Sequence, residues 1–339
     1  MLAFNLRYAL LLTSLVFIPV VHASSFDCAS AVSKTEKTIC SDSYISDLDK
    51  KLGALWRPTL AKVADPKALK ADQRGWLKNR NQCAEDVPCL RREYLMRLKA
   101  LEYMVKPFSW DATWQIIPWG VSSGATLQTK RIDADHISFD ISAVAGANSG
   151  DMDGIATIVG TEAHYSGTGC TLKFSAFNGL LDVTQDGSDP TCGGGMGVYY
   201  GGRYVASEQS QSIDYDLLSL GVARTQQEDE LLHALLKDDY QTLLQNSGSM
   251  ASGDASSDIP NAQVDEFWLR GLANSNAGIL MRAPEGKLWL VLLVFDDQRE
   301  SRARYYTNVP EWKKRVPNAL LAWHKRIADD QTLPLDLMP

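Results

Sequence analysis

The chain has 339 residues, 45% of them hydrophobic, and a formal net charge of −7. This content is enough for ordinary buried cores, the length predicts two or three domains, and the acidic balance argues against nucleic acid as a partner. Residues 24–106 carry 16 Lys and Arg against 11 Asp and Glu, residues 107–260 carry 6 against 20, and residues 261–339 carry 11 against 10. The middle of the chain is therefore an acidic block.

The first 23 residues have the pattern of a signal peptide. One positive charge, Arg7, precedes an apolar run over residues 8–21, and Val21-His22-Ala23 fits the small-x-small rule for cleavage after Ala23. The run is too short to span a bilayer comfortably, so no stable membrane insertion is expected. The sequence predicts an exported, periplasmic protein whose first domain begins at residue 24.

Residues 24–106 have the pattern of a small helical bundle. Ser33-x-x-Glu36 is a capping box, and Asp65-Pro66 marks a further helix start. An apolar stripe predicts a long helix between these two sites, and Pro58 is expected to kink or split it. The positions expected on the buried faces are Ile45, Leu48, Leu52, Leu55, Trp56, Leu60 and Val63, and in a last helix opened by Asp86 and Pro88, Leu90, Tyr94, Leu98, Leu101 and Val105.

The six cysteines of an exported chain indicate disulfides. They are Cys28, Cys40, Cys83, Cys89, Cys170 and Cys192. The first four allow three connectivities, which the sequence leaves open: Cys28 and Cys40 are expected to bridge either to the Cys83–Cys89 region or to each other. For the last two, a bridge between adjacent strands is predicted, which typically contributes about 3 kcal/mol through the unfolded state.

Residues 107–210 change to a period of two and predict an antiparallel sheet or small barrel. Asn178-Gly179 predicts a two-residue hairpin turn, with positive φ at both positions. In that register Phe174 lies opposite Val183 and Ala176 opposite Leu181. The glycine-rich stretch over residues 192–205 predicts a corner and one more strand.

Residues 211–339 predict a helix, a linker and a small α+β C-terminal module. The helix runs over 225–241 and a little beyond, and the Gly/Ser/Asp-rich residues 246–261 have the composition of a linker or long loop. Two strands surround the Pro-Glu-Gly-Lys turn at 284–287, and a helix over 319–327 follows. The whole chain is thus expected to be a multidomain α+β protein.

No motif indicates an enzyme, a metal site or a cofactor. Asp151-x-Asp153-Gly154 resembles part of a calcium loop, but position 160 is glycine where such a loop needs glutamate, so a polar turn between strands is predicted. Gly120-x-Ser122-x-Gly124 lacks the strand before it and the helix after it that a nucleophile elbow requires, so it is predicted to be a loop. The Cys83-x5-Cys89 spacing is too wide for a redox pair.

The first four cysteines, together with a set of nine other residues, resemble the LprI-type lysozyme inhibitor family over about residues 26–103. The nine are Asp27, Glu36, Leu48, Asp49, Gln73, Trp76, Arg80, Tyr94 and Arg97. Pro58 departs from the family pattern, in which the long helix is usually unbroken. The acidic segment is similar to β-rich domains often fused to this one. It also faintly resembles the barrel of membrane-bound c-type lysozyme inhibitors, but Gly201-Gly202-Arg203-Tyr204 lacks the serine of their inhibitory loop.

The resemblance implies a protein that binds a c-type lysozyme and occludes its cleft without covalent chemistry. An envelope interaction or scaffold module with no lysozyme target is the alternative. Animal lysozymes are strongly basic, so attraction is expected to come from the acidic middle block rather than from the basic helical segment. The oligomeric state is left open.

Overall fold

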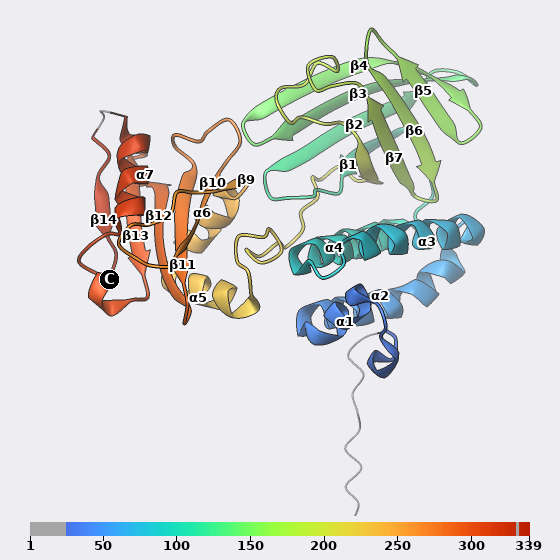
Figure 1. Cartoon of the computed structure of the whole chain (residues 1–339). Helices are drawn as coiled ribbons and strands as arrows, with labels where there is room; N and C mark the ends of the chain where they lie inside the picture. Colours follow the sequence, from blue (N-terminus) through green and yellow to red (C-terminus); the bar gives the residue numbers. More distant parts are fainter. Residues whose placement is uncertain (1–24, 330–331) are drawn as a thin grey trace, which may run out of the picture.

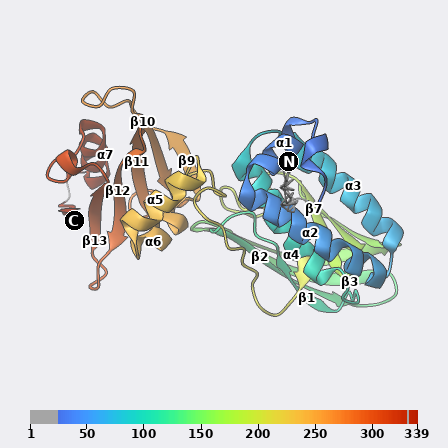
Figure 2. The same cartoon turned by 90° about the horizontal axis from the view of Figure 1, so that it is seen from below.

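The structure, a computed structural model, describes residues 25–329 and 332–339, so the predicted signal peptide lies outside the described residues. A layer of helices lies under a β-barrel, and a sheet with helices on both faces stands beside them (Figures 1 and 2). This arrangement confirms the predicted multidomain α+β class. None of the helices in the described ranges is long and apolar enough to cross a membrane.

The helical region begins with a 3-10 turn, η1 (Cys28–Ser30), followed by α1 (Lys34–Ser41), α2 (Ser43–Lys62), α3 (Pro66–Gln82) and α4 (Val87–Tyr103). The helix starts follow the predicted caps: the capping box at Ser33 is formed, Asp65 caps α3 and Asp86 caps α4. Each cap gives a partner to backbone amides that the first helical turn leaves unbonded. Local sequence therefore determines where these helices begin.

Three expectations for the helices need correction. Pro58 does not split α2, which continues to Lys62. Pro58 lies on the exposed face, as does Ala54, whose carbonyl the proline leaves unbonded, so water can bond that carbonyl. Leu55 is also on this face, and Val105 lies beyond the end of α4; both are exposed, with 38% and 40% of their surfaces in solvent.

All six cysteines lie in the described part of the chain and are paired. The bridges are Cys28–Cys40, Cys83–Cys89 and Cys170–Cys192, so the pairing predicted for the last two is confirmed. This last bridge does not join two strands as expected, because Cys170 precedes a strand and Cys192 lies in a turn. The first bridge ties η1 to α1, and the second closes the turn between α3 and α4. Both are local, so the helices are held together by their core rather than by sulfur.

The middle of the chain closes into a barrel of eight antiparallel strands within the described residues. They are β1 (Ala112–Ile116), β2 (Ser123–Arg131), β3 (His136–Ala145), β4 (Asn148–Val159), β5 (Glu162–Ser166), β6 (Thr171–Phe177), β7 (Leu180–Asp186) and β8 (Gly202–Ala206). Inward side chains such as Leu127, Phe139, Phe174 and Tyr204 fill the interior, as expected for this strand number.

The predicted β6–β7 hairpin has the expected register, with Phe174 opposite Val183 and Ala176 opposite Leu181. Its turn differs from the prediction, because only Asn178 has a positive φ, of 50°. Gly179 is required for a different reason. A Cβ atom there would lie 2.5 Å from the carbonyl oxygens of Tyr103 and Lys106, so the glycine lets the barrel approach the end of α4.

Asp151 and Asp153 do not form the predicted polar turn; they lie within strand β4. The period of two continues through this strand, but three of its inward residues, Gly150, Gly154 and Ala156, are small, so the large apolar side chains that usually indicate a strand are few. A Cβ atom on Gly154 would lie 2.6 Å from the ring of Tyr165, so aromatic side chains from neighbouring strands occupy the space that β4 leaves empty.

The C-terminal module contains α5 (Gln226–Leu236), α6 (Asp239–Asn246), β9 (Ser249–Ser252), β10 (Gln263–Trp268), β11 (Ala277–Ala283), β12 (Lys287–Phe295), β13 (Ser301–Thr307), a 3-10 turn η2 (Pro310–Trp312), α7 (Asn318–Ala328) and β14 (Leu335–Leu337). The sheet order is β14-β13-β12-β11-β10-β9. Leu290 and Leu292 of β12 pack with α5 and α6, whereas Val291 and Leu293 belong to the core under α7. Because β12 is buried on both faces, its residues 288–294 form a continuous apolar run.

Two expectations for this module were wrong. The helix predicted over 225–241 is broken at Lys237, whose φ is 52°, and this break places Asp239 at the start of α6, where it pairs with Arg304 at 2.7 Å. The segment 246–261 is not only a linker, because Ser249–Ser252 forms β9 along the edge of β10. Its composition does not favour a strand, and the neighbouring strand supplies the hydrogen-bonding partners.

The helical region and the barrel share one hydrophobic core. Ile117, Leu180 and Val205 of the barrel cluster with the buried residues of α2, α3 and α4. At the edge of this contact, Asn178 accepts a hydrogen bond of 2.8 Å from the Asp65 amide. These two parts of the molecule therefore form a continuous packed unit.

Candidate functional site

The resemblance residues of the helical region form a largely buried network. The Tyr94 hydroxyl donates a hydrogen bond of 2.7 Å to Asp49, and Arg80 Nη1 donates one of 2.9 Å to the Tyr94 oxygen. Trp76 packs edge-on against Tyr94 at 5.2 Å between ring centroids. Burial raises the pKa of Tyr94, and the nearby Arg80 opposes this effect. Asp49, Tyr94 and Arg80 are buried, so these three residues stabilise the bundle rather than face a partner.

The other resemblance residues have separate places. Asp27 caps η1, Glu36 closes the capping box of α1, and Leu48 lies in the core of the bundle. The amides of Ser33 and Val32 donate to Glu36 and hold its pKa below the ordinary value. Gln73 accepts hydrogen bonds from the guanidinium of Arg97. Two of the nine, Trp76 and Arg97, line a cavity.

This cavity, which we call the junction pocket, lies between α3, α4 and the barrel and has a volume of about 290 Å³. Its apolar walls come from Trp76, Met96, Ala100 and Ile117. Its polar lining comes from Asp72, Asn79, Glu93, Arg97 and Arg203, and the remaining lining residue is Gly75. The sequence did not indicate this polar lining, and it pointed to Arg203 only as part of a loop. Asp72 and Arg203 are 131 positions apart in the chain, and the fold brings them together.

Asp72 connects the two guanidinium groups of the junction pocket. Arg203 binds it at 2.8 Å, and Arg97 also forms an ion pair with it. Burial alone would raise the pKa of Asp72, but Arg203 and Arg97 outweigh that effect and hold the pKa below its ordinary value. Arg203 makes a second ion pair, of 2.8 Å, with Asp182 of β7. The network thus ties α3 and α4 to the barrel.

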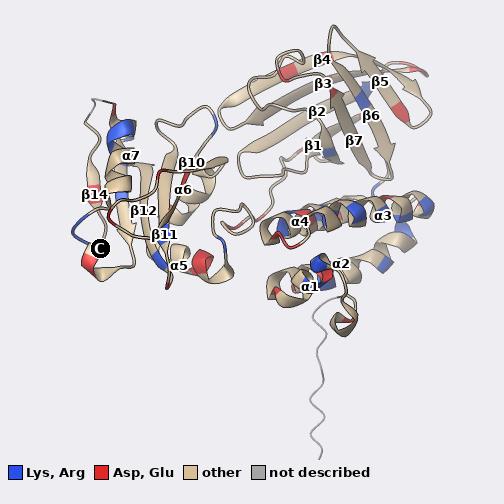
Figure 3. Cartoon of the chain, viewed as in Figure 1, with Lys and Arg blue, Asp and Glu red and all other residues tan. Residues whose placement is uncertain are grey.

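A second, larger hollow lies on the outer surface of β1, β2, β3 and β4, and we call it the acidic groove. Its volume is about 870 Å³, and its lining includes Asp111, Asp140, Asp153, Glu208 and one cation, Lys130. All four carboxylates are exposed, and within the described residues none forms an ion pair. Residues 107–210 carry 4 Lys and Arg against 11 Asp and Glu, and Figure 3 shows few cations along the barrel ribbon.

Two of these acids lie directly opposite each other. Asp140 of β3 pairs with Asp153 of β4 in the strand register, and both side chains point outward. Like charges at opposed positions of a sheet repel each other and destabilise it. A cationic partner would relieve this repulsion. The alternation of residues 137–144 places Asp140 outward from sequence alone, but its pairing with Asp153 depends on the fold.

The other motif from the sequence has no catalytic arrangement. Gly120 and Ser122 lie in the turn that leads into β2, as the loop prediction stated, whereas Gly124 already belongs to the strand, and no helix follows the motif. The carbonyl of Ser122 accepts a hydrogen bond of 2.8 Å from the amide of Gly146. Among the described residues, no group of three or more His, Cys, Asp or Glu side chains is arranged to hold a metal ion.

Comparison of the chain with models of known protein families, with curated proteins and with solved structures gave no match. The resemblance to LprI-type inhibitors therefore stays a prediction.

Proposed function

We propose that this is an exported binding protein that inhibits a c-type lysozyme by covering its cleft, with the acidic groove as the contact. One observation supports this most strongly: a hollow of about 870 Å³ lined by four exposed carboxylates and a single lysine. Complementary charge accelerates the encounter with a basic protein and selects against other partners. The mode of action is non-covalent, since it needs only surface complementarity.

Export to the periplasm, after cleavage near Ala23, is part of the proposal. Three disulfides support it, because such bridges form and persist in oxidising compartments.

An envelope scaffold without a lysozyme target is the second candidate. Burial of the Asp49–Tyr94–Arg80 network favours it, because these resemblance residues stabilise the bundle and leave no exposed motif for an enzyme cleft.

The test compares the mature chain with the double variant Asp140→Asn/Asp153→Asn. Lysozyme inhibition is measured as the turbidity of a cell-wall suspension, and the association rate is measured at low and physiological salt. Because the double variant removes two of four carboxylates, we expect association at low salt to slow by about tenfold. The variant should also unfold at slightly higher temperature, since the opposed carboxylates no longer repel each other.

The control is Asp297→Asn/Glu300→Gln, which changes the net charge equally on an exposed loop of the C-terminal module. It should inhibit as the unmodified protein does. The proposal fails if the unmodified protein does not inhibit lysozyme, or if both double variants inhibit equally. Separate expression of the helical region is a poor test, because that region shares its core with the barrel.

A further inference from the structure

Three of the four charged side chains that line the junction pocket are held in ion pairs. Two guanidinium groups, Arg97 and Arg203, are bound by two carboxylates, Asp72 and Asp182. Each of these four groups has its ionic partner. Glu93 is the fourth charged side chain in the lining, and among the described residues its carboxylate forms no ion pair.

Glu93 is half-buried on α4. Within residues 25–329 and 332–339, no Lys, Arg or His nitrogen lies within ion-pair distance of its carboxylate. The Trp76 indole donates a hydrogen bond of 3.3 Å to its backbone carbonyl. Burial raises the pKa of Glu93, opposed by Trp76 and by the charge of Arg92. A carboxylate that is partly removed from water is stabilised by a cation.

We propose that the junction pocket binds an alkyl chain that ends in a guanidinium or ammonium group, with the cation on Glu93. The chain would lie along the apolar walls made by Trp76, Met96 and Ile117. A volume of about 290 Å³ is at the lower end for ligand sites, which suits one side chain or a small amine rather than a larger molecule.

Arginine and lysine side chains have this form, and so do free alkylamines. The ligand therefore has two possible sources, a small molecule or a residue of another protein. The pocket shares no lining residue with the acidic groove, so this inference does not rest on lysozyme inhibition.

Calorimetric titration of the mature chain with agmatine, which is cationic at both ends, tests the inference, with N-butylurea as an uncharged comparison. We expect agmatine to bind at least about tenfold more tightly, because charge-assisted hydrogen bonds are the stronger ones. A second titration uses a capped pentapeptide with a central arginine and, as its uncharged counterpart, the same peptide with citrulline at that position. Tighter binding of the arginine peptide than of agmatine indicates a protein side chain as the source, and the reverse indicates a free amine.

Two variants, each with a control, test whether agmatine binds in the junction pocket. Glu93→Gln should weaken agmatine binding by about tenfold, whereas Glu102→Gln, an exposed position on the same helix, should not change it. Gly75 lines the pocket, and a Cβ atom there would meet nothing within 4 Å. Gly75→Phe should therefore fold and obstruct the pocket, while Gly75→Ala binds normally. Absence of agmatine binding, or equal binding by Glu93→Gln, overturns the inference.

Discussion

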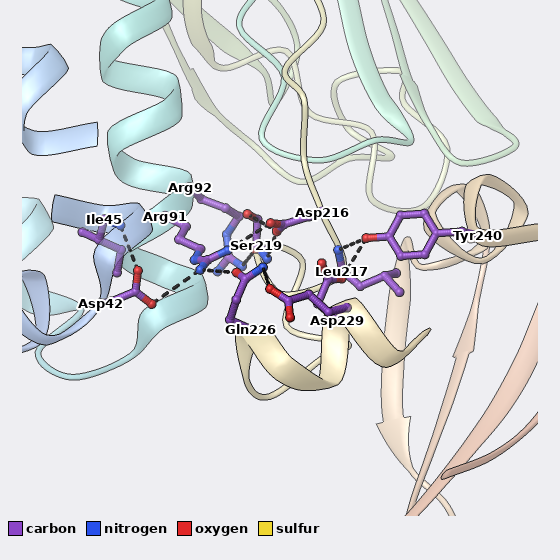
Figure 4. Close-up of polar contacts among 11 residues, drawn as sticks. Asp42, Ile45, Arg91, Arg92, Asp216, Leu217, Ser219, Gln226, Asp229 and Tyr240 are labelled. Atoms are coloured by element: carbon purple, nitrogen blue, oxygen red, sulfur yellow. Dashed lines mark hydrogen bonds and ion pairs between the residues drawn. The ribbon is translucent and has the colours of Figure 1, made fainter. Parts of the chain in front are cut away.

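The helical region meets its two neighbours through different kinds of contact. Towards the barrel it shares an apolar core that includes Leu180 and Val205, both fully buried. Towards the C-terminal module the main contact is polar and centres on Arg91 of α4 (Figure 4). Arg91 Nη1 donates to Asp216 of the connecting segment, and Nη2 donates to Gln226 of α5, each at 2.9 Å.

The polar contact continues into the C-terminal module. Asp216 also accepts a 2.6 Å hydrogen bond from the Ser219 amide. The hydroxyl of Tyr240 in α6 donates a hydrogen bond to Asp229 and accepts one from the Leu217 amide (Figure 4). Apolar burial is spread over many atoms, whereas this connection depends on a few directed bonds. The helical region and the barrel therefore act as one unit. The C-terminal module is attached to this unit mainly by polar contacts, which also include a 2.9 Å hydrogen bond from the Ala147 amide of the barrel to the Arg270 carbonyl.

The largest expected effect follows from a substitution in the core that the helical region and the barrel share. Leu180→Ala should destabilise the protein by about 3 kcal/mol, because it leaves a cavity in a fully buried site. Hydrogen exchange should then accelerate in α3 and α4 as well as in β7 and β8. Leu321→Ala, at a position 42% exposed on α7, is the control and should change little. Faster exchange confined to the barrel would contradict a shared core.

A smaller effect is expected at the polar contact. Arg91→Met should loosen the C-terminal module by about 2 kcal/mol, because bonds to a charged donor are lost at a site only 1% exposed. The measurement is the rate of proteolysis in the exposed connecting residues 208–214. Lys34→Met removes the same charge from an exposed ion pair and should leave the rate unchanged. Unaltered proteolysis of the Arg91 variant would show that other contacts hold the module.

The smallest expected effect concerns the stability of the folded protein at acid pH. The lowered pKa of Asp72 means that its ion pairs stabilise the folded protein above the unfolded pKa, near 3.9, and that this contribution is lost as pH falls through the folded value. Burial raises the pKa of Asp229, so its contribution has the opposite sign and is lost as pH rises. Thermal unfolding below about pH 5 should therefore show a weaker pH dependence for Asp72→Asn. Identical slopes would contradict this role of Asp72.

The sequence predicted those features that depend on neighbouring residues. The helix starts at Ser33, Asp65 and Asp86 follow from side chains that bond amides two or three positions away. The hairpin register at Asn178 likewise follows from a two-residue turn. Predictions failed where a distant segment decided the outcome: β9 forms along β10, and the aromatic rings of neighbouring strands fill the space beside the small residues of β4.

The same division applies to the candidate sites. The acidic character of the middle block is present in the composition, and alternation in β3 directs Asp140 outward. The junction pocket could not be foreseen, because α3 and β8 supply Asp72 and Arg203 from positions 131 residues apart. By itself, the sequence determined the local elements and the sign of the charge, because both depend on short-range bonding and on composition. Only the tertiary structure decided which charged side chains form ion pairs and which, like Glu93, form none among the described residues, because ion pairing depends on distance in space.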